Sequence, residues 1–344
     1  MDFLTAANLT HPNGETTHYY EGGSPDGTPI VFIHGWPDIA QVWHHQLKQF
    51  SSGSLGSKYR VLALDMRGYG GSSAPTNKRA YSLQALCDEL VDFASQLAIK
   101  HAIWVAHDWG CAIVSALAAH HPDLFLGMAL LAVPYRTIEL GLDHVISLVN
   151  RDLYPEEQYP YGQWEYMKKY ELDPDESVNS YLATDVKKLT KVLYSRHDPD
   201  TLGKPARTSR TLRDGWFGRK PESIPDIPLS YTSLDESLYN ALVESHNKHG
   251  FFPPTAYYLN HDANTQFAKS EVNGGVLEFP VLFIDAKYDA VCSTMTTPKM
   301  WESQKAFIKN LLYERIDAAH WVQLEKPKET NKALEQWLEE ALKL

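Results

Sequence analysis

Short apolar runs that each end in turn-forming residues recur along this chain and constrain its fold most strongly. They occupy residues 29–35, 60–68, 101–110, 126–134 and 279–289. Runs this rich in Val, Ile and Leu are typical of strands buried on both faces of a parallel sheet. Between two of the runs, apolar residues recur at three- and four-residue steps and predict an amphipathic helix. They are Leu83, Leu86, Leu90, Phe93 and Leu97. Strands that alternate with helices predict an α/β fold with a mainly parallel sheet.

The alternation stops near Pro134 and resumes near Phe279, and the segment between these points differs in composition. It holds 12 of the 19 tyrosines, together with Trp164 and Trp216, in helical rather than strand-like patterns. Because so long a segment exceeds the loops of compact domains, we expect a helical insertion. Such an insertion would cover the C-terminal edge of the sheet, where open α/β sheets bind ligands. The predicted parts are a first core part at 1–134, a helical cap at 135–268 and a second core part at 269–344.

Charge and cysteine content narrow the classes of partner. The net charge of −11 does not favour binding to nucleic acid or anionic lipid, which are themselves negatively charged. Cys87, Cys111 and Cys292 are odd in number and lack ligand-like spacing, which favours reduced intracellular thiols over disulfides or a metal site. No apolar run reaches membrane-spanning length, and the N-terminal residues lack a signal-peptide pattern. These features predict a cytoplasmic protein with no membrane partner, and a homodimer is one of the oligomeric states left open.

An aspartate interrupts one of the apolar runs, in the stretch WVAHDWGCAI at 104–113. A carboxylate between two apolar segments is costly unless it is paired or used in chemistry. Ala106 and Gly110 lie two residues before and after Asp108, as small residues do around the nucleophile of a strand-turn-helix elbow. The alternative is a helix-capping aspartate.

Several motifs in the order of the α/β-hydrolase superfamily resemble its epoxide hydrolases in particular. The motifs are HGWPD at 34–38, DMRGYGGSSAP at 65–75, HDWG at 107–110, KYDAV at 287–291 and AAHWVQLEKP at 318–327. They resemble the HGxP loop, the glycine-rich segment, the elbow with aspartate in place of serine, and the segments that carry the acid and the histidine. The resemblance implies an α/β-hydrolase fold, with a mainly parallel sheet flanked by helices and an inserted helical cap.

The resemblance also implies roles for individual residues. Asp108 would be the nucleophile, because a carboxylate attacking an epoxide carbon leaves an ester that water can cleave, whereas serine would leave an ether. His320 would be the general base that activates this water, and Asp289 would orient it. The backbone amides of Trp36 and Trp109 would form the oxyanion hole. Neither a metal nor an organic cofactor is implied.

Opening an epoxide also requires an acid at its oxygen, which the family supplies from two lid tyrosines. FFPPTAYYLN at 251–260 resembles the segment that carries one of them and places it at Tyr258. YPYGQWEYMKKY at 159–170 resembles the other segment, but its spacing puts Gln163 at the donor position. The nearby alternatives are Tyr161, Tyr166 and Tyr154.

The predicted function is hydrolysis of a small, apolar or aromatic epoxide to a vicinal diol. A haloalkane-type dehalogenase using the same Asp/His/Asp set is the alternative, although those enzymes usually place Asn at the position of Trp36. A third reading is a non-catalytic binding protein on the hydrolase scaffold. The intact set of Asp108, Asp289 and His320 argues against it.

Overall fold

An eight-stranded sheet forms the centre of the computed structural model, which describes residues 3–174, 185–217 and 223–343. Its strand order is β1-β2-β4-β3-β5-β6-β7-β8. The strands are β1 Thr5–Thr10, β2 Thr16–Gly23, β3 Thr28–Ile33, β4 Tyr59–Leu64, β5 Ala102–His107, β6 Phe125–Leu131, β7 Leu277–Ala286 and β8 Ile308–Ile316. β3 to β8 pair in parallel, whereas β1 and β2 join the sheet antiparallel. The predicted α/β fold with a mainly parallel sheet is confirmed.

The predicted apolar runs form the inner strands β3 to β7. Every residue of β5 is buried, as expected for a strand covered on both faces. The edge strand β8 was not predicted, because most of its residues are exposed or half-buried and its sequence therefore has no continuous apolar run. The β1–β2 hairpin was not predicted for the same reason.

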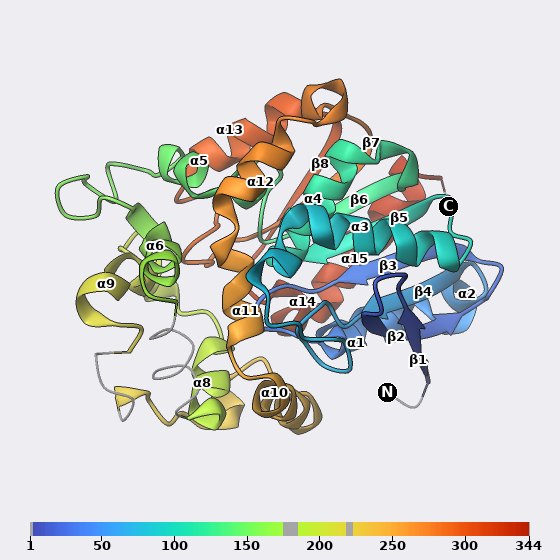
Figure 1. The fold of residues 1–344 in the computed structure, drawn as a ribbon, viewed down its shortest axis with the longest axis horizontal. Helices are drawn as coiled ribbons and strands as arrows, with labels where there is room; N and C mark the ends of the chain where they lie inside the picture. The colour runs from blue at the N-terminus through green and yellow to red at the C-terminus, as the bar shows by residue number, and fades with distance from the viewer. Residues whose placement is uncertain (1–2, 175–184, 218–222, 344) are drawn as a thin grey trace.

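Helices cover the sheet, and α3 matches the predicted amphipathic helix. Ser82 caps its N-terminus by accepting a hydrogen bond from the amide of Ala85. The helical elements outside the β6–β7 connection are η1 Ala40–Trp43, α1 His44–Phe50, α2 Gly53–Gly56, η2 Lys78–Tyr81, α3 Leu83–Gln96, α4 Trp109–His120, η3 Pro122–Leu124, α13 Pro298–Phe307, α14 Val322–Glu325 and α15 Pro327–Ala341. Figure 1 shows α3 and α4 in front of the sheet and α15 behind it.

The connection between β6 and β7 is helical, as the sequence predicts. Its described elements are η4 Ile138–Leu140, α5 Leu142–Ser147, η5 Gly162–Trp164, α6 Glu165–Leu172, α8 Val186–Leu193, η7 Pro199–Thr201, η8 Arg207–Arg210, α9 Thr211–Asp214, η10 Leu229–Tyr231, α10 Glu236–His249, α11 Phe252–Ala256, η11 Tyr257–Leu259, α12 His261–Ala268 and η12 Val272–Gly275. In Figure 1, α6, α8 and α9 lie together on the side of the molecule away from the chain ends. Residues 175–184 and 218–222 of the predicted cap lie outside the described residues.

The last helix of the predicted cap contacts the core. The side chain of Asn264 in α12 accepts a hydrogen bond of 2.9 Å from the amide of Leu83, at the start of α3. Phe267 stacks on His120 of α4, with ring centroids 3.7 Å apart. The cap boundaries at 135 and 268 remain predictions. Across the described segments, no helix is both long and apolar enough to cross a membrane.

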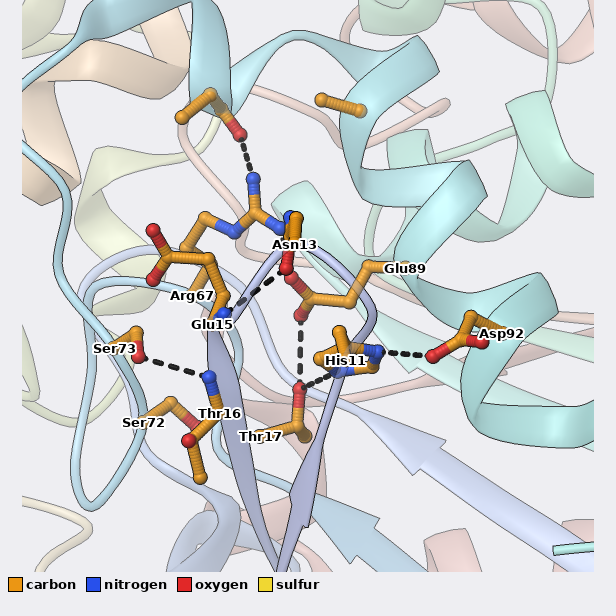
Figure 2. Close-up of polar contacts among 12 residues, drawn as sticks. His11, Asn13, Glu15, Thr16, Thr17, Arg67, Ser72, Ser73, Glu89 and Asp92 are labelled. Atoms are coloured by element: carbon orange, nitrogen blue, oxygen red, sulfur yellow. Dashed lines mark hydrogen bonds and ion pairs between the residues drawn. The ribbon is translucent and has the colours of Figure 1, made fainter. Parts of the chain in front are cut away.

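A polar network attaches the N-terminal hairpin to the helices and loops of the core (Figure 2). Arg67, in the glycine-rich segment, forms an ion pair with Glu89 of α3, and both side chains are buried. Glu89 also accepts a hydrogen bond of 3.1 Å from the hydroxyl of Thr17 in β2. His11 bonds to Thr17 at 2.8 Å and to Asp92 at 2.6 Å. Because Glu89 and Asp92 of α3 bond to Thr17 and His11 of the hairpin, the network fixes the hairpin against α3.

Candidate active site

Asp108 occupies a sharp turn between β5 and α4. Its backbone has φ 52° and ψ −124°, which is strained for any residue other than glycine. The turn brings the chain very close to β3: a Cβ atom on Gly110 would lie 2.3 Å from the carbonyl oxygen of Ile33. A Cβ atom on Gly35 would lie 2.5 Å from the Asp108 carboxylate. The predicted elbow geometry is therefore present, and it needs small residues around the aspartate.

Two backbone amides hold the carboxylate of Asp108. The amide of Trp36 donates to its Oδ1 at 2.6 Å. The amide of Trp109 also forms a hydrogen bond with this carboxylate. In an ester of Asp108, the oxygen that gains negative charge during hydrolysis is a carboxyl oxygen of Asp108 itself. Donors already placed on that group can stabilise this charge without rearrangement.

His320 lies between two carboxylates at the C-terminal ends of the parallel strands. Its Nε2 is 3.4 Å from Oδ2 of Asp108, and its Nδ1 is 2.6 Å from Oδ2 of Asp289. The structure thus brings together the three side chains that the sequence predicts as nucleophile, base and acid. Parallel strands cause this meeting, because loops after β5, β7 and β8 emerge at the same edge.

Asp289 is held in place by its own turn. Its Oδ1 accepts hydrogen bonds from the amides of Val291 at 2.8 Å and Cys292 at 2.9 Å, which leaves Oδ2 for His320. Asp285, at the end of β7, is a second acidic residue close by in the sequence, but it forms an ion pair with Arg315, Nε to Oδ2, at 2.9 Å. The geometry therefore favours Asp289 as the partner of the histidine.

The charges of the three groups shift one another's pKa values. Burial by itself would raise the pKa of Asp108, but the hydrogen bond and charge of His320 lower it below the ordinary value. Burial would likewise raise the pKa of Asp289, and the charge of His320 again lowers it. For His320, burial lowers the pKa, but the charge of Asp289 and the interaction with Asp108 outweigh it and raise the pKa to about 10. Both carboxylates are therefore ionised at neutral pH, with a protonated imidazole between them.

A buried carboxylate that the sequence prediction left without a role, Asp38, lies behind the site. It accepts hydrogen bonds from the indole N–H of Trp321 at 3.1 Å and from the hydroxyl of Tyr194. Its Oδ2 is 3.4 Å from Nδ1 of His107, and Nε2 of His107 bonds to the carbonyl oxygen of His320 at 2.9 Å. The sequence could have identified Asp38 by its position directly after HGWP, because a charged residue in a buried loop needs hydrogen-bond or ion-pair partners.

Two tyrosines of the β6–β7 connection lie near Asp108. The ring of Tyr258, in η11, packs edge-on against Trp109 at 5.0 Å and lies 5.6 Å from the ring of Tyr166 in α6. Burial, followed by the charges of Tyr166 and Asp108, raises the pKa of Tyr258 well above its ordinary value. Burial, followed by the charges of Cys292 and Asp108, likewise raises the pKa of Tyr166. A hydrogen bond with Tyr258 lowers this pKa, but by less. Both hydroxyls are therefore protonated and able to donate.

The other proposed lid donors have different surroundings. The side-chain amide of Gln163 donates to the carbonyl oxygen of Val291 at 3.3 Å and to the hydroxyl of Thr297 at 3.1 Å. The hydroxyl of Tyr154 accepts a hydrogen bond from the amide of Ala206 at 3.0 Å. Tyr161 is half-buried at the start of η5. The structure places Tyr166, one helical turn after Gln163, beside Tyr258.

Aromatic rings pack against one another near these groups. Trp36 and Trp216 stack with centroids 6.2 Å apart and an interplanar angle of 17°. Tyr166 lies 5.5 Å from Trp216, and Tyr170 lies 4.9 Å from Tyr258. Aromatic side chains of this kind suit the binding of apolar or aromatic molecules. Among the described side chains, no group of three or more His, Cys, Asp or Glu is arranged to hold a metal ion.

A sequence model of the alpha/beta hydrolase fold family matches residues 28–327. This chain belongs to the α/β-hydrolase fold family. The chain is 29% identical over 95% of its length to bifunctional epoxide hydrolase 2 of Sus scrofa. It spans only about half of that relative, 54%. It is 26% identical to epoxide hydrolase A of Mycobacterium tuberculosis, over 96% of each chain. Among solved structures, epoxide hydrolase A from Mycobacterium thermoresistibile superposes with a TM-score of 0.73 at 25% identity, covering 98% of each chain.

Proposed function

We propose that this hydrolase converts an epoxide to a vicinal diol through a covalent ester on Asp108. One observation carries the proposal: the carboxylate of Asp108 accepts a hydrogen bond from the amide of Trp36 and lies 3.4 Å from Nε2 of His320, while Tyr258 packs against Trp109, the next residue. Similarity over nearly the whole chain to proteins named epoxide hydrolases supports it. The packed aromatic rings support an apolar or aromatic substrate.

The first step needs a nucleophile and an acid. A carboxylate oxygen of Asp108 attacks an epoxide carbon, and the bond between that carbon and the ring oxygen breaks. The ring oxygen takes a proton from Tyr258 or Tyr166 and becomes a hydroxyl group. Asp108 is suited to this attack because its lowered pKa keeps it ionised without any base.

The second step needs a base. Esterification removes the negative charge of Asp108, which is one of the interactions that raise the pKa of His320 to about 10 in the free enzyme. The pKa of His320 should therefore fall once the ester has formed, and the proton that it loses replaces the one the tyrosine gave up. Neutral His320 then takes a proton from water, and the resulting hydroxide attacks the ester carbonyl. The amides of Trp36 and Trp109 stabilise the oxyanion. Its collapse breaks the bond between the ester carbon and the substrate oxygen, which takes the proton of the new carboxyl group and leaves as a hydroxyl of the diol, so that Asp108 is again a carboxylate.

We propose further that residues 135–268 act as a cap over this site and that no cofactor takes part. Support comes from Tyr166 and Tyr258, which lie in this segment beside the nucleophile. Every step above uses only protein groups and water. The unpaired cysteines favour a cytoplasmic location.

A single-turnover reaction in ¹⁸O-labelled water tests the covalent step. With enzyme in excess over styrene oxide, the first diol should carry no ¹⁸O, because its new oxygen comes from Asp108. Label should appear in the peptide that contains Asp108. Label entering the first diol directly from water would refute the proposal. Assaying halide release from 1-bromobutane in parallel distinguishes the dehalogenase alternative.

A further inference from the structure

A short cap segment, Tyr194–His197, crosses from α8 to the loops of the active site. The amide of Ser233 donates to the carbonyl oxygen of Tyr194 at 2.9 Å, and Nε of Arg196 donates to that of Thr232 at 3.0 Å. The segment is therefore anchored within the cap at residues 231–233. Its two aromatic side chains, however, point at the core.

Tyr194 contacts the loop of the catalytic histidine. Its ring lies on that of Trp321, the residue after His320, with centroids 4.2 Å apart. Its hydroxyl donates to the fully buried carboxylate of Asp38. Asp38 also accepts a hydrogen bond from the indole N–H of Trp321 at 3.1 Å, so each of these three side chains contacts the other two.

The same carboxylate reaches the elbow. Oδ2 of Asp38 is 3.4 Å from Nδ1 of His107, the residue before Asp108. Nε2 of His107 bonds to the carbonyl oxygen of His320 at 2.9 Å. Tyr194 is thus linked through one side chain to the neighbours of both the nucleophile and the base.

His197 contacts the remaining catalytic loop. Its ring stacks on Tyr288, the residue before Asp289, at 4.8 Å and an interplanar angle of 14°. Its Nδ1 bonds to the carboxylate of Glu325, whose side chain is only 2% exposed. The other oxygen of Glu325 accepts from the amide of Ala319, the residue before His320, at 2.9 Å.

The segment therefore contacts, directly or through one buried carboxylate, a chain neighbour of each of the three catalytic side chains. Removing one partner of a buried carboxylate leaves that group unsatisfied, so the loops would rearrange to satisfy it. We propose that Tyr194 and His197 are positioning residues. They hold the loops of Asp108, Asp289 and His320 in fixed positions relative to one another, so that the alignment of these three side chains depends on the cap. The inference rests on the proposed function, since it concerns the same reaction.

Two variants remove the polar links and keep the rings. Tyr194→Phe deletes the hydroxyl on Asp38, and His197→Phe deletes the bond to Glu325 while retaining a ring against Tyr288. Lys191→Met is the matched control, because it removes an ion pair with Asp226 that lies within the cap. The probe is styrene oxide, with ester formation and ester decay followed separately by rapid quench and mass spectrometry.

We expect ester decay to slow roughly ten- to hundredfold in both variants, because small misplacements of reacting groups have effects of this size. Alkylation should change less than decay, since it does not use His320 as a base. The pH dependence of decay should shift, and NMR titration of His320 should show its raised pKa moving back toward the ordinary value. The Lys191→Met control should match the wild type.

Lower thermal stability with an unmoved His320 titration and an unmoved pH profile would overturn the proposal, because it would show a merely structural role. Unchanged decay in both variants would also overturn it. If the wild-type enzyme forms no ester on Asp108, the proposed function itself fails. The NMR comparison of His320 between wild type and variants then decides the positioning role by itself.

Discussion

At the scale of single residues, Asp108 and His320 serve different steps of the proposed reaction, so substitutions should separate the steps. His320→Gln should still form the ester but hydrolyse it slowly, and alkylated protein should accumulate. Asp108→Ala should form no ester. Intact-protein mass spectrometry after mixing with styrene oxide measures both, with the exposed His101→Gln as a control. Absence of the adduct in the His320 variant, despite substrate binding, would show that His320 is also needed for alkylation.

The two cap tyrosines allow a second prediction at this scale. Tyr258→Phe should lower the alkylation rate by roughly 10²- to 10⁴-fold, the usual size of general acid assistance. Tyr166→Phe should also lower it, because its protonated hydroxyl lies in the same aromatic group. Gln163→Ala should have a smaller effect, since its amide bonds to Val291 and Thr297. Rapid-quench alkylation kinetics would decide, and a Gln163 effect larger than both tyrosine effects would reverse this assignment.

The shifted pKa values give a third prediction. The pKa of Asp108 is lowered, so alkylation should be independent of pH from about 5 to 8, where this carboxylate stays ionised. Ester hydrolysis needs neutral His320, so its rate should rise with pH and level off above the pKa of His320 in the ester form. That value should lie below the value of about 10 in the free enzyme. Measuring both rate constants against pH tests this, and a hydrolysis rate that falls with rising pH would contradict it.

At the scale of elements, the elbow depends on the close approach of β3 to the start of α4. Gly110→Ala would place a Cβ atom 2.3 Å from the carbonyl oxygen of Ile33, so backbone must shift. We expect activity to fall at least about a hundredfold, because the nucleophile and its amide donors would separate. Ser115→Ala, in the same helix, is the control: its buried hydroxyl has no hydrogen-bond partner, so its loss should cost little. Wild-type activity in Gly110→Ala would show that the elbow tolerates a side chain.

The sequence pattern identified elements according to how deeply they are buried. The inner strands were predictable because burial on both faces requires continuous apolar runs. β8 was not, because it lies at the edge of the sheet and carries exposed polar residues. Asp289 and His320, the proposed acid and base, were identified from motifs that follow β7 and β8, even though β8 itself was not predicted.

At the scale of the whole molecule, the network in Figure 2 predicts a stability effect remote from the site. Glu89→Gln removes one charge of the buried pair with Arg67 and should lower the free energy of unfolding by roughly 3 kcal/mol. Glu171→Gln, which breaks a surface pair with Lys168 within α6, should cost less than about 1 kcal/mol. Urea denaturation measures both. Equal losses in the two variants would show that burial of the first pair does not matter.

The sequence by itself predicted the strand-helix alternation, the elbow around Asp108 and the chain order of the proposed nucleophile, acid and base. Each of these depends on neighbours along the chain or on which residue follows which strand. Only the tertiary structure shows that Tyr166 packs beside Tyr258, because a one-turn difference between Gln163 and Tyr166 matters only once α6 is placed. It also decided the partners of Asp38 and Glu325, since Tyr194 and His197 reach them across more than a hundred residues of sequence. Contacts of this kind arise from packing between distant segments, which no local spacing encodes.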